Sequence, residues 1–120
     1  MVEKLKKSPK KIQASFYQTP GGKEPVRSWL KALEEEDRRI IGYDIATVEY
    51  GWPIGMPTCR AMGDGLFEVR SPITGKRIAR VLFCTAEGVL VLLHGFIKKA
   101  KKTPKEDLAL AKKRMKEIKR

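Results

Sequence analysis

The segment VLVLLHGFIKKAKKTPKE (residues 89–106) decides the fold of this chain. It opens with a run of apolar residues, which is typical of a strand that is buried on both faces. Four lysines then follow within five positions: Lys98, Lys99, Lys101 and Lys102. The segment closes on Thr-Pro-Lys-Glu, a sequence typical of a helix start. We therefore predict a central strand whose carboxyl end carries a lysine cluster, followed directly by a helix.

The helix after this strand has the clearest signature in the chain. Thr103 suits the N-cap, Pro104 the first helical position, and Glu106 the third, where its carboxylate completes a capping box. Apolar side chains recur at helical spacing, at Leu108, Ala111, Met115 and Ile118. Many of the other positions are Lys or Arg. The pattern predicts a helix with one face on the protein core and a basic face in solvent.

Two further strands precede the segment. LFEVR (residues 66–70) and RIARVLFC (residues 77–84) have the apolar, branched and aromatic composition of strands, and residues 71–76 between them contain Pro and Gly. A turn at Gly88 leads into the strand at residues 89–97. These three strands are therefore predicted to form an antiparallel meander.

The first half of the chain predicts one strand and two helices. Alternating apolar residues indicate a strand at residues 12–17, and Pro25 opens a helix that continues to Leu33. A second helix is expected at residues 37–50, whereas residues 51–65 are rich in Gly and Pro and are expected to be a loop. The order β-α-α-β-β-β-α predicts an α+β fold: a helical hairpin packed on a small twisted antiparallel sheet, with a C-terminal helix.

Length and charge restrict the class of protein. With 120 residues, the chain is expected to form one domain over residues 12–120, preceded by a basic arm at residues 1–11 that holds five lysines. The formal net charge of +12 favours an anionic partner, such as nucleic acid, an acidic protein or a membrane surface. No run of 18 apolar residues is present, and the basic N-terminus lacks the apolar run of a secretory signal. We expect a cytoplasmic protein without a membrane span.

Motifs exclude several kinds of chemistry. Cys59 and Cys84 have no CxxC partner and the chain has one His, so a disulfide framework or a zinc site is not expected. GxxxxGK[ST], HExxH and GxSxG are absent. The sequence gives no support to nucleotide hydrolysis, zinc proteolysis or serine hydrolysis, and it indicates no cofactor.

Side chains alternate across strands, so the meander has a predictable polar face. If the hairpin is centred near Thr74, Glu68 lies opposite Arg80, and Arg70 lies opposite Ile78. The next strand adds three residues of matching parity: His94, Phe96 and Lys98. The other face is then wholly apolar and is expected to carry the helices. A register slip of one residue would change this grouping.

Each polar residue also has a structural interpretation. Glu68 and Arg80 could form only a cross-strand ion pair, and His94 could be a core histidine with satisfied hydrogen bonds. The lysine run could simply be solvated. Two arginines beside a lysine cluster nevertheless favour phosphate binding. One guanidinium group can bind two phosphate oxygens in a bidentate manner, and lysine adds positive charge.

Two stretches, LFEVRSPITGKRIARVLFC and VLVLLHGFIKKAKKTPKEDLALAKKR, make the chain similar to a known family. In order and spacing, most of residues 12–118 resembles the RelE/HigB superfamily of bacterial toxins, in particular its phage-derived HigB-like branch. The most specific part is LLHGFIKKAKKTP followed by a helix containing AKKR. The resemblance implies a microbial-ribonuclease-like α+β fold. It also implies a type II toxin that cleaves mRNA on the ribosome and is inhibited by a HigA-like antitoxin with a helix-turn-helix domain.

The resemblance also implies roles for individual residues. Arg70 and Arg80 are assigned to the scissile phosphate, and Lys98 and Lys99 to phosphate stabilisation or proton donation. Further RNA contacts are expected from Lys76, Arg77, Lys101 and Lys102. No metal is required for this chemistry, because the 2′-OH of RNA attacks the adjacent phosphate and preorganised cations stabilise the developing charge.

The general acid and base are the open part of this assignment. Many relatives place a Tyr or His near the C-terminus, but the last helix here has neither. Glu68 and His94 are the candidates for a base, because Arg does not deprotonate at neutral pH. Two other functions fit the same residues: a nucleic-acid-binding module without catalysis, and a degenerate toxin that only binds its antitoxin.

Overall fold

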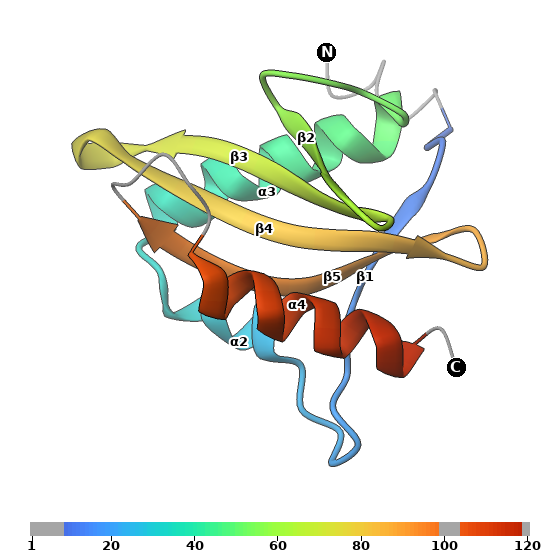
Figure 1. The fold of residues 1–120 in the computed structure, drawn as a ribbon. Helices are drawn as coiled ribbons and strands as arrows, with labels where there is room; N and C mark the ends of the chain where they lie inside the picture. The colour runs from blue at the N-terminus through green and yellow to red at the C-terminus, as the bar shows by residue number, and fades with distance from the viewer. Residues whose placement is uncertain (1–8, 99–103, 119–120) are drawn as a thin grey trace.

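The computed structural model describes residues 9–98 and 104–118, and this part of the chain folds as the expected α+β domain (Figure 1). Its elements in chain order are β1 (Gln13–Phe16), α2 (Pro25–Ala32), α3 (Glu35–Gly51), β2 (Cys59–Gly63), β3 (Leu66–Ile73), the 3₁₀ turn η1 (Thr74–Lys76), β4 (Arg77–Ala86), β5 (Val89–Lys98) and α4 (Lys105–Ile118). The helices and the three long strands lie where the sequence predicts them, to within a few residues. Residues 1–8 of the predicted arm (residues 1–11) and the proposed N-cap Thr103 lie outside the described residues.

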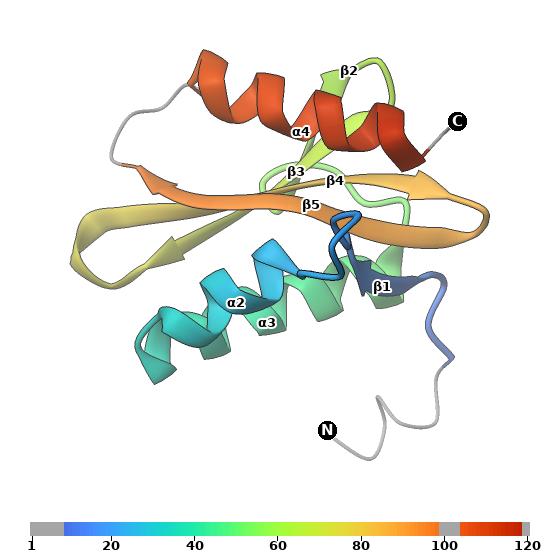
Figure 2. The ribbon, with the colours of Figure 1, turned by 90° about the horizontal axis from the view of Figure 1, so that it is seen from below.

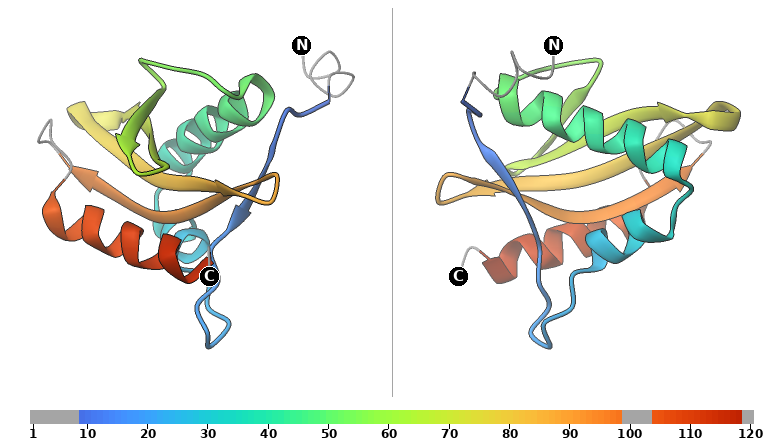
Figure 3. Two further views of the ribbon diagram at one scale, coloured as in Figure 1. Left: turned by 45° about the vertical axis from the view of Figure 1, so that its right-hand side comes forward. Right: turned by 180° about the vertical axis from the view of Figure 1, so that it is seen from behind.

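The five strands form one sheet in the order β1-β5-β4-β3-β2. The pairs β2–β3, β3–β4 and β4–β5 are antiparallel. Strand β1 instead runs parallel to β5, with Gln13 beside Val89. The expectation of a wholly antiparallel sheet is therefore wrong for β1. The long connection between these strands, which contains both α2 and α3, permits the parallel entry. Figure 3 shows β1 at the edge of the sheet opposite to β2.

The outer edge of β1 is closed by a glutamate from α3. Glu49 accepts a hydrogen bond from the backbone N–H of Ala14 at 2.7 Å and lies 3.2 Å from Lys10 Nζ. Its backbone carbonyl also accepts hydrogen bonds from the N–H groups of Lys11 and Ile12. An unpaired strand edge exposes backbone N–H and C=O groups. The buried Glu49 side chain accepts a hydrogen bond that a neighbouring strand would otherwise accept.

Strand β2 is absent from the sequence-based prediction, which expected a loop across residues 51–65. Its five residues have no simple alternation of buried and exposed side chains, and the register with β3 shifts between Ala61 and Gly63. A turn at Asp64 and Gly65, both with positive φ, then reverses the chain into β3. A short edge strand with a bulge carries too little periodicity to be recognised from the sequence.

Helices cover both faces of the sheet, with α2 and α3 on one side and α4 on the other (Figure 2). The core under α2 and α3 includes Val26, Ile41 and Phe83. The core under α4 contains Leu66, Leu82, Cys84, Leu93, Ala111 and Met115, with Leu108 and Ile118 at its margin. The apolar stripe predicted for the last helix is therefore confirmed. The prediction that a single apolar face carries all the helices is wrong. The face with Glu68 and Arg80 also has apolar residues, Leu66, Leu82 and Cys84, and α4 packs on them.

The hairpin of β3 and β4 is centred one residue later than predicted. Glu68 lies opposite Leu82, and Arg70 lies opposite Arg80, because β3 continues as far as Ile73. The turn is only three residues long, and its Gly75 (φ 72°) and Lys76 (φ 58°) adopt left-handed conformations. Since the partner of each residue shifts by two positions, every side chain keeps its predicted face.

Pro72 can lie within β3 because the pairing of β3 with β2 does not extend beyond Val69. The N–H of Arg70 donates to the carbonyl of Thr58 at 2.8 Å, and the N–H position on the same edge two residues later belongs to Pro72. The missing donor therefore falls on an edge without a strand partner among the described residues. As a result, β3 has an open edge near the hairpin turn.

Trp29 of α2 packs directly on Gly95 of β5. A Cβ atom built on Gly95 would lie 2.4 Å from Trp29 Cε3, whereas one built on Gly42 of α3 would have no atom within 4 Å. Close contact between this helix and the strand therefore requires glycine. The described helices include none that is long and apolar enough to span a membrane.

We predict opposite effects for the same change at these two glycines. Gly95→Ala should lower the free energy of unfolding by roughly 1–3 kcal/mol, because Trp29 has to move. Gly42→Ala, the matched control, should raise it by up to about 1 kcal/mol, because alanine favours a helix. Urea unfolding of the two variants measures both effects. Equal stability of wild type and Gly95→Ala would contradict the close packing of Trp29.

Candidate functional site

The polar face of the sheet contains a carboxylate between two guanidinium groups. Glu68 Oε2 lies 3.5 Å from Arg80 Nη1, and Glu68 Oε1 lies 3.8 Å from Arg70 Nε. Strands β3 and β4 bring these groups together, since Arg70 and Arg80 face each other in the register. The structure therefore assembles the three residues as a cluster on one face, although with different pairing from that predicted.

The two arginines differ sharply in exposure. The side chains of Glu68 and Arg80 are 0% exposed, whereas that of Arg70 is 22% exposed. Arg70 is thus the member of the cluster that reaches the surface. Arg80 lies beneath it and is held by the Glu68 carboxylate. A buried charge pair of this kind persists only where the partners satisfy each other's charge.

Besides burial, the carboxylate of Glu68 contributes to a raised pKa of the Cys59 thiol. Burial, followed by the negative charge of Glu68, raises the pKa of the Cys59 thiol to about 11. Cys59 and Cys84 are both buried. At neutral pH, Cys59 is therefore a protonated thiol with little nucleophilic character.

His94 lies on the same face of the sheet, opposite Leu82, as its parity predicts. Its Nε2 lies 2.6 Å from Asp107 Oδ1 in the first turn of α4, and its ring stacks on Phe96 with centroids 5.6 Å apart. A carboxylate only accepts hydrogen bonds, so the contact orients the imidazole with Nε2 as the donor. Sequence reasoning missed Asp107, for which the only signal was an acidic residue in the first turn of a helix beside the strand.

Lys98 ends β5 opposite Ile78 and is exposed, on the same face as Arg70. Of the remaining lysines predicted for this site, Lys99, Lys101 and Lys102 lie outside the described residues. Of the four cations predicted to be catalytic, Arg70 and Lys98 are therefore the two that the described residues place at the surface. Within the described ranges, no group of three His, Cys, Asp or Glu side chains could hold a metal ion.

Arg77, expected to contact RNA, anchors the hairpin turn to α3. Its Nη2 lies 2.7 Å from Asp37 Oδ2, and its Nε donates to the carbonyl of Thr74 at 2.9 Å. Asp37 also accepts hydrogen bonds from the backbone N–H and the hydroxyl of Thr74. Burial raises the pKa of Asp37, but the hydrogen bonds from Arg77 and Thr74 outweigh burial, so its pKa is lowered overall. Lys76, the other predicted contact, is exposed in the turn.

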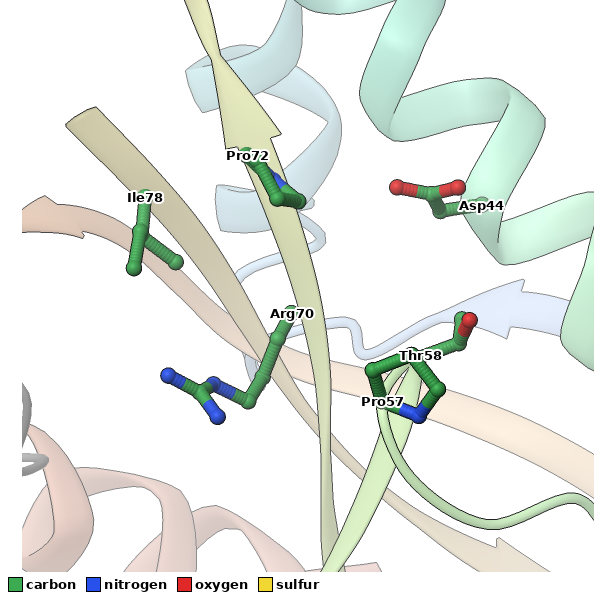
Figure 4. Close-up of a pocket in the computed structure, with 6 residues that line it drawn as sticks. All are labelled: Asp44, Pro57, Thr58, Arg70, Pro72 and Ile78. Atoms are coloured by element: carbon green, nitrogen blue, oxygen red, sulfur yellow. The ribbon is translucent and has the colours of Figure 1, made fainter. Parts of the chain in front are cut away.

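A pocket of about 240 Å³ opens beside Arg70 at the free edge of β3 (Figure 4). It is lined by Asp44, Pro57, Thr58, Arg70, Pro72 and Ile78. Figure 4 shows the carboxylate of Asp44 directed from α3 toward β3, and the guanidinium of Arg70 directed to the opposite side of the strand. Sequence reasoning did not identify this pocket, because its walls come from four segments: α3, the loop before β2, β3 and β4.

Comparison with known proteins gives one match. The family described as "Phage derived protein Gp49-like (DUF891)" matches residues 28–116, which include α3, all of β2 to β5 and most of α4. Among curated proteins, none matches the chain. The family match supports the phage-derived character that the sequence resemblance implied.

The ion pair of Asp37 and Arg77 predicts a pH-dependent contribution to stability. Because the pKa of Asp37 is lowered in the folded state, this contribution is present above its unfolded pKa of about 3.9 and is lost as the pH falls through the folded value. We expect wild type to exceed Asp37→Asn in stability at pH 7, and the difference to shrink below about pH 4.

Urea unfolding between pH 7 and pH 2.5 measures this effect. Asp64→Asn is the matched control, because the Asp64 side chain is 81% exposed and its replacement should leave the pH profile almost unchanged. A constant difference between wild type and Asp37→Asn over this range would contradict the assigned ion pair.

The buried pair of Glu68 and Arg80 predicts strong coupling. Arg80→Met should lower the free energy of unfolding by about 3–5 kcal/mol, because it removes a guanidinium that pairs with the buried carboxylate of Glu68. Adding Glu68→Leu to Arg80→Met should recover much of the loss, because apolar residues of similar volume often replace a buried ion pair at little cost. A double-mutant cycle by urea unfolding measures the coupling. Additive effects would show that the two side chains do not interact.

Proposed function

The chain belongs to the Gp49-like family of phage-derived proteins, and from this premise we propose that it is the toxin of a type II toxin–antitoxin system that cleaves mRNA. The observation that carries the proposal is the cluster of Arg70, Glu68 and Arg80, with one guanidinium at the surface and a second beneath it. The resemblance to RelE/HigB toxins supports cleavage on the ribosome, and the net charge of +12 suits an RNA substrate.

The proposed reaction uses the nucleophile that RNA itself contains. The 2′-OH attacks the adjacent phosphorus, a cyclic phosphate forms, and the bond to the 5′-oxygen of the next nucleotide breaks. Negative charge grows on the phosphoryl oxygens during attack. Arg70, partly exposed and oriented by Glu68, binds these oxygens, and Lys98 adds positive charge at the end of β5.

Arg80 acts as a positioning residue in this proposal. Its side chain is buried and cannot reach the phosphate, but it pairs with the carboxylate of Glu68. Glu68 in turn lies beside Nε of the Arg70 guanidinium and orients it. The terminal nitrogens of Arg70 then remain available for phosphate. A buried second arginine also keeps Glu68 from opposing the approach of an anion, because the cluster as a whole carries one positive charge if all three groups are ionised.

His94 is the side chain best suited to move a proton. Its Nε2 is held by Asp107, which leaves Nδ1 as the atom that can accept a proton when the imidazole is neutral. Asp107 then stabilises the imidazolium that results. The arrangement is typical of an oriented general base. Lys99, which lies outside the described residues, remains a candidate for proton donation by resemblance alone.

The partners follow from the same proposal. The substrate is mRNA on the ribosome, and a HigA-like helix-turn-helix antitoxin is expected to inhibit the toxin, both by resemblance. A binding module without catalysis is the second candidate. It is favoured by one observation, the engagement of both Glu68 and His94 with charged partners, which also suits a purely structural role.

Substitution of the exposed cations tests catalysis without disturbing the buried pair. Arg70→Gln should slow mRNA cleavage by at least about a hundredfold, and Lys98→Gln by about tenfold, because each removes a group that stabilises the transition state. Lys31→Gln, on the exposed surface of α2, is the matched control and should cleave normally.

Primer extension on mRNA in a reconstituted translation reaction measures cleavage, and growth after induction measures toxicity. A 2′-deoxy nucleotide at the cleavage position should abolish the cut. Full activity of Arg70→Gln would overturn the assigned site. A folded wild-type protein that neither cleaves mRNA nor arrests growth would overturn the proposed function.

A further inference from the structure

The pocket at the open edge of β3 combines features of a site for one planar group. Its volume of about 240 Å³ lies just below the 300 Å³ at which pockets for complete small ligands begin. Pro57 and Pro72 supply apolar ring surfaces, and Ile78 adds an aliphatic one. Such a pocket has room for a single ring system in contact with apolar side chains.

The strand-edge side of this pocket presents hydrogen-bond acceptors, while the Thr58 hydroxyl can donate or accept and the Arg70 guanidinium points away. The carboxylate of Asp44 is directed toward the edge of β3 (Figure 4), and no hydrogen bond or ion pair engages it within residues 9–98 and 104–118. At the same edge, Pro72 has a carbonyl but no N–H. A group that enters the pocket can therefore donate its N–H groups to the Asp44 carboxylate and the Pro72 carbonyl.

The pocket also adjoins the phosphate side of the cluster. Arg70 lines it, while the Arg70 guanidinium lies across β3 from Asp44, toward the sheet face that carries Arg80 and Lys98. A nucleotide whose phosphate meets Arg70 would therefore have its base within reach of the strand edge. This places base recognition and phosphate binding on the two sides of one strand.

We propose that this pocket binds one RNA base that carries an exocyclic amino group, with Asp44 accepting its hydrogen bond. Adenine, cytosine and guanine offer an exocyclic amino donor. Uracil has none, and its single ring N–H donor, at N3, lies between two carbonyl oxygens that repel a carboxylate. The inference rests on the proposed function, and it adds a base preference to it. A basic peptide offers N–H donors too, but the charge of +12 favours RNA over a cationic partner.

Binding of short RNA oligomers tests this inference without requiring cleavage. Fluorescence anisotropy compares labelled hexamers of A, C and U, in each of which all six bases are the same. Wild type should bind the A and C hexamers about tenfold more tightly than U. Asp44→Asn should bind U nearly as well as the others, because an amide turns its N–H₂ toward the uracil carbonyl. Asp64→Asn, a matched change on an exposed side chain, should keep the preference.

Two results would overturn the inference. Equal affinity of wild type for all three hexamers would do so, and so would an unchanged preference in a folded Asp44→Asn. Asp44-dependent binding of argininamide in place of RNA would assign the pocket to a protein side chain and would also overturn it. Mapping the cleaved bases in the translation reaction separates the two proposals. Cleavage that is as strong in Asp44→Asn as in wild type, with the same base preference, rejects the pocket and leaves the nuclease intact.

Discussion

The buried carboxylate of Glu68 is the constraint on which the arrangement of this sheet depends. A charge without solvent exposure is tolerated only beside opposite charge, so Arg80 and Arg70 have to lie next to it. A register shifted by one residue between β3 and β4 would turn these groups toward opposite faces of the sheet, away from each other. The cost of such an error, about 3–5 kcal/mol for a broken buried pair, is comparable with the stability of a small domain. The cluster therefore helps to define both the register and the position of the surface guanidinium.

The division of one sheet face into two parts explains how a charged cluster fits inside a small protein. Leu82 and Cys84 share a face with Arg80, but they lie farther along β4, where α4 packs on them. The helix thus buries the apolar part of the face, and Asp107 in its first turn meets His94 beside the polar part. Burial raises the strength of each charge interaction there, because water is excluded. Packing and polar chemistry are arranged along the same strands rather than on opposite faces of the sheet.

The sequence was sufficient for the fold class and for the face of each polar residue, because both depend on periodicity. It predicted Arg70, Arg80 and His94 on one face, and that holds even though the register is shifted, since the shift is by two residues. It was not sufficient for the exposure of Arg80, which depends on how completely the surrounding elements cover that face. Periodicity also could not reveal β2, whose register is irregular, or the parallel entry of β1, which depends on the long connection through α2 and α3. Asp107 and Asp44 come from helices, so only the tertiary structure shows that they lie beside the strands.

Charge on this protein can act at long range, through the net charge, and at short range, through single side chains in contact with a ligand. Different residues supply these two effects. The net charge of +12 attracts any polyanion and loses effect over about one Debye length, so in the proposed function it brings RNA close without selecting a sequence. Selection requires a short-range contact whose sign opposes the general field, and Asp44 at the edge of β3 is such a group. In the proposed complex, its negative charge weakens RNA binding slightly for every base and stabilises a bound base only when an amino group donates to it. If RNA is the ligand, as proposed, an acidic residue in the pocket of a strongly basic protein contributes to discrimination between bases rather than to affinity.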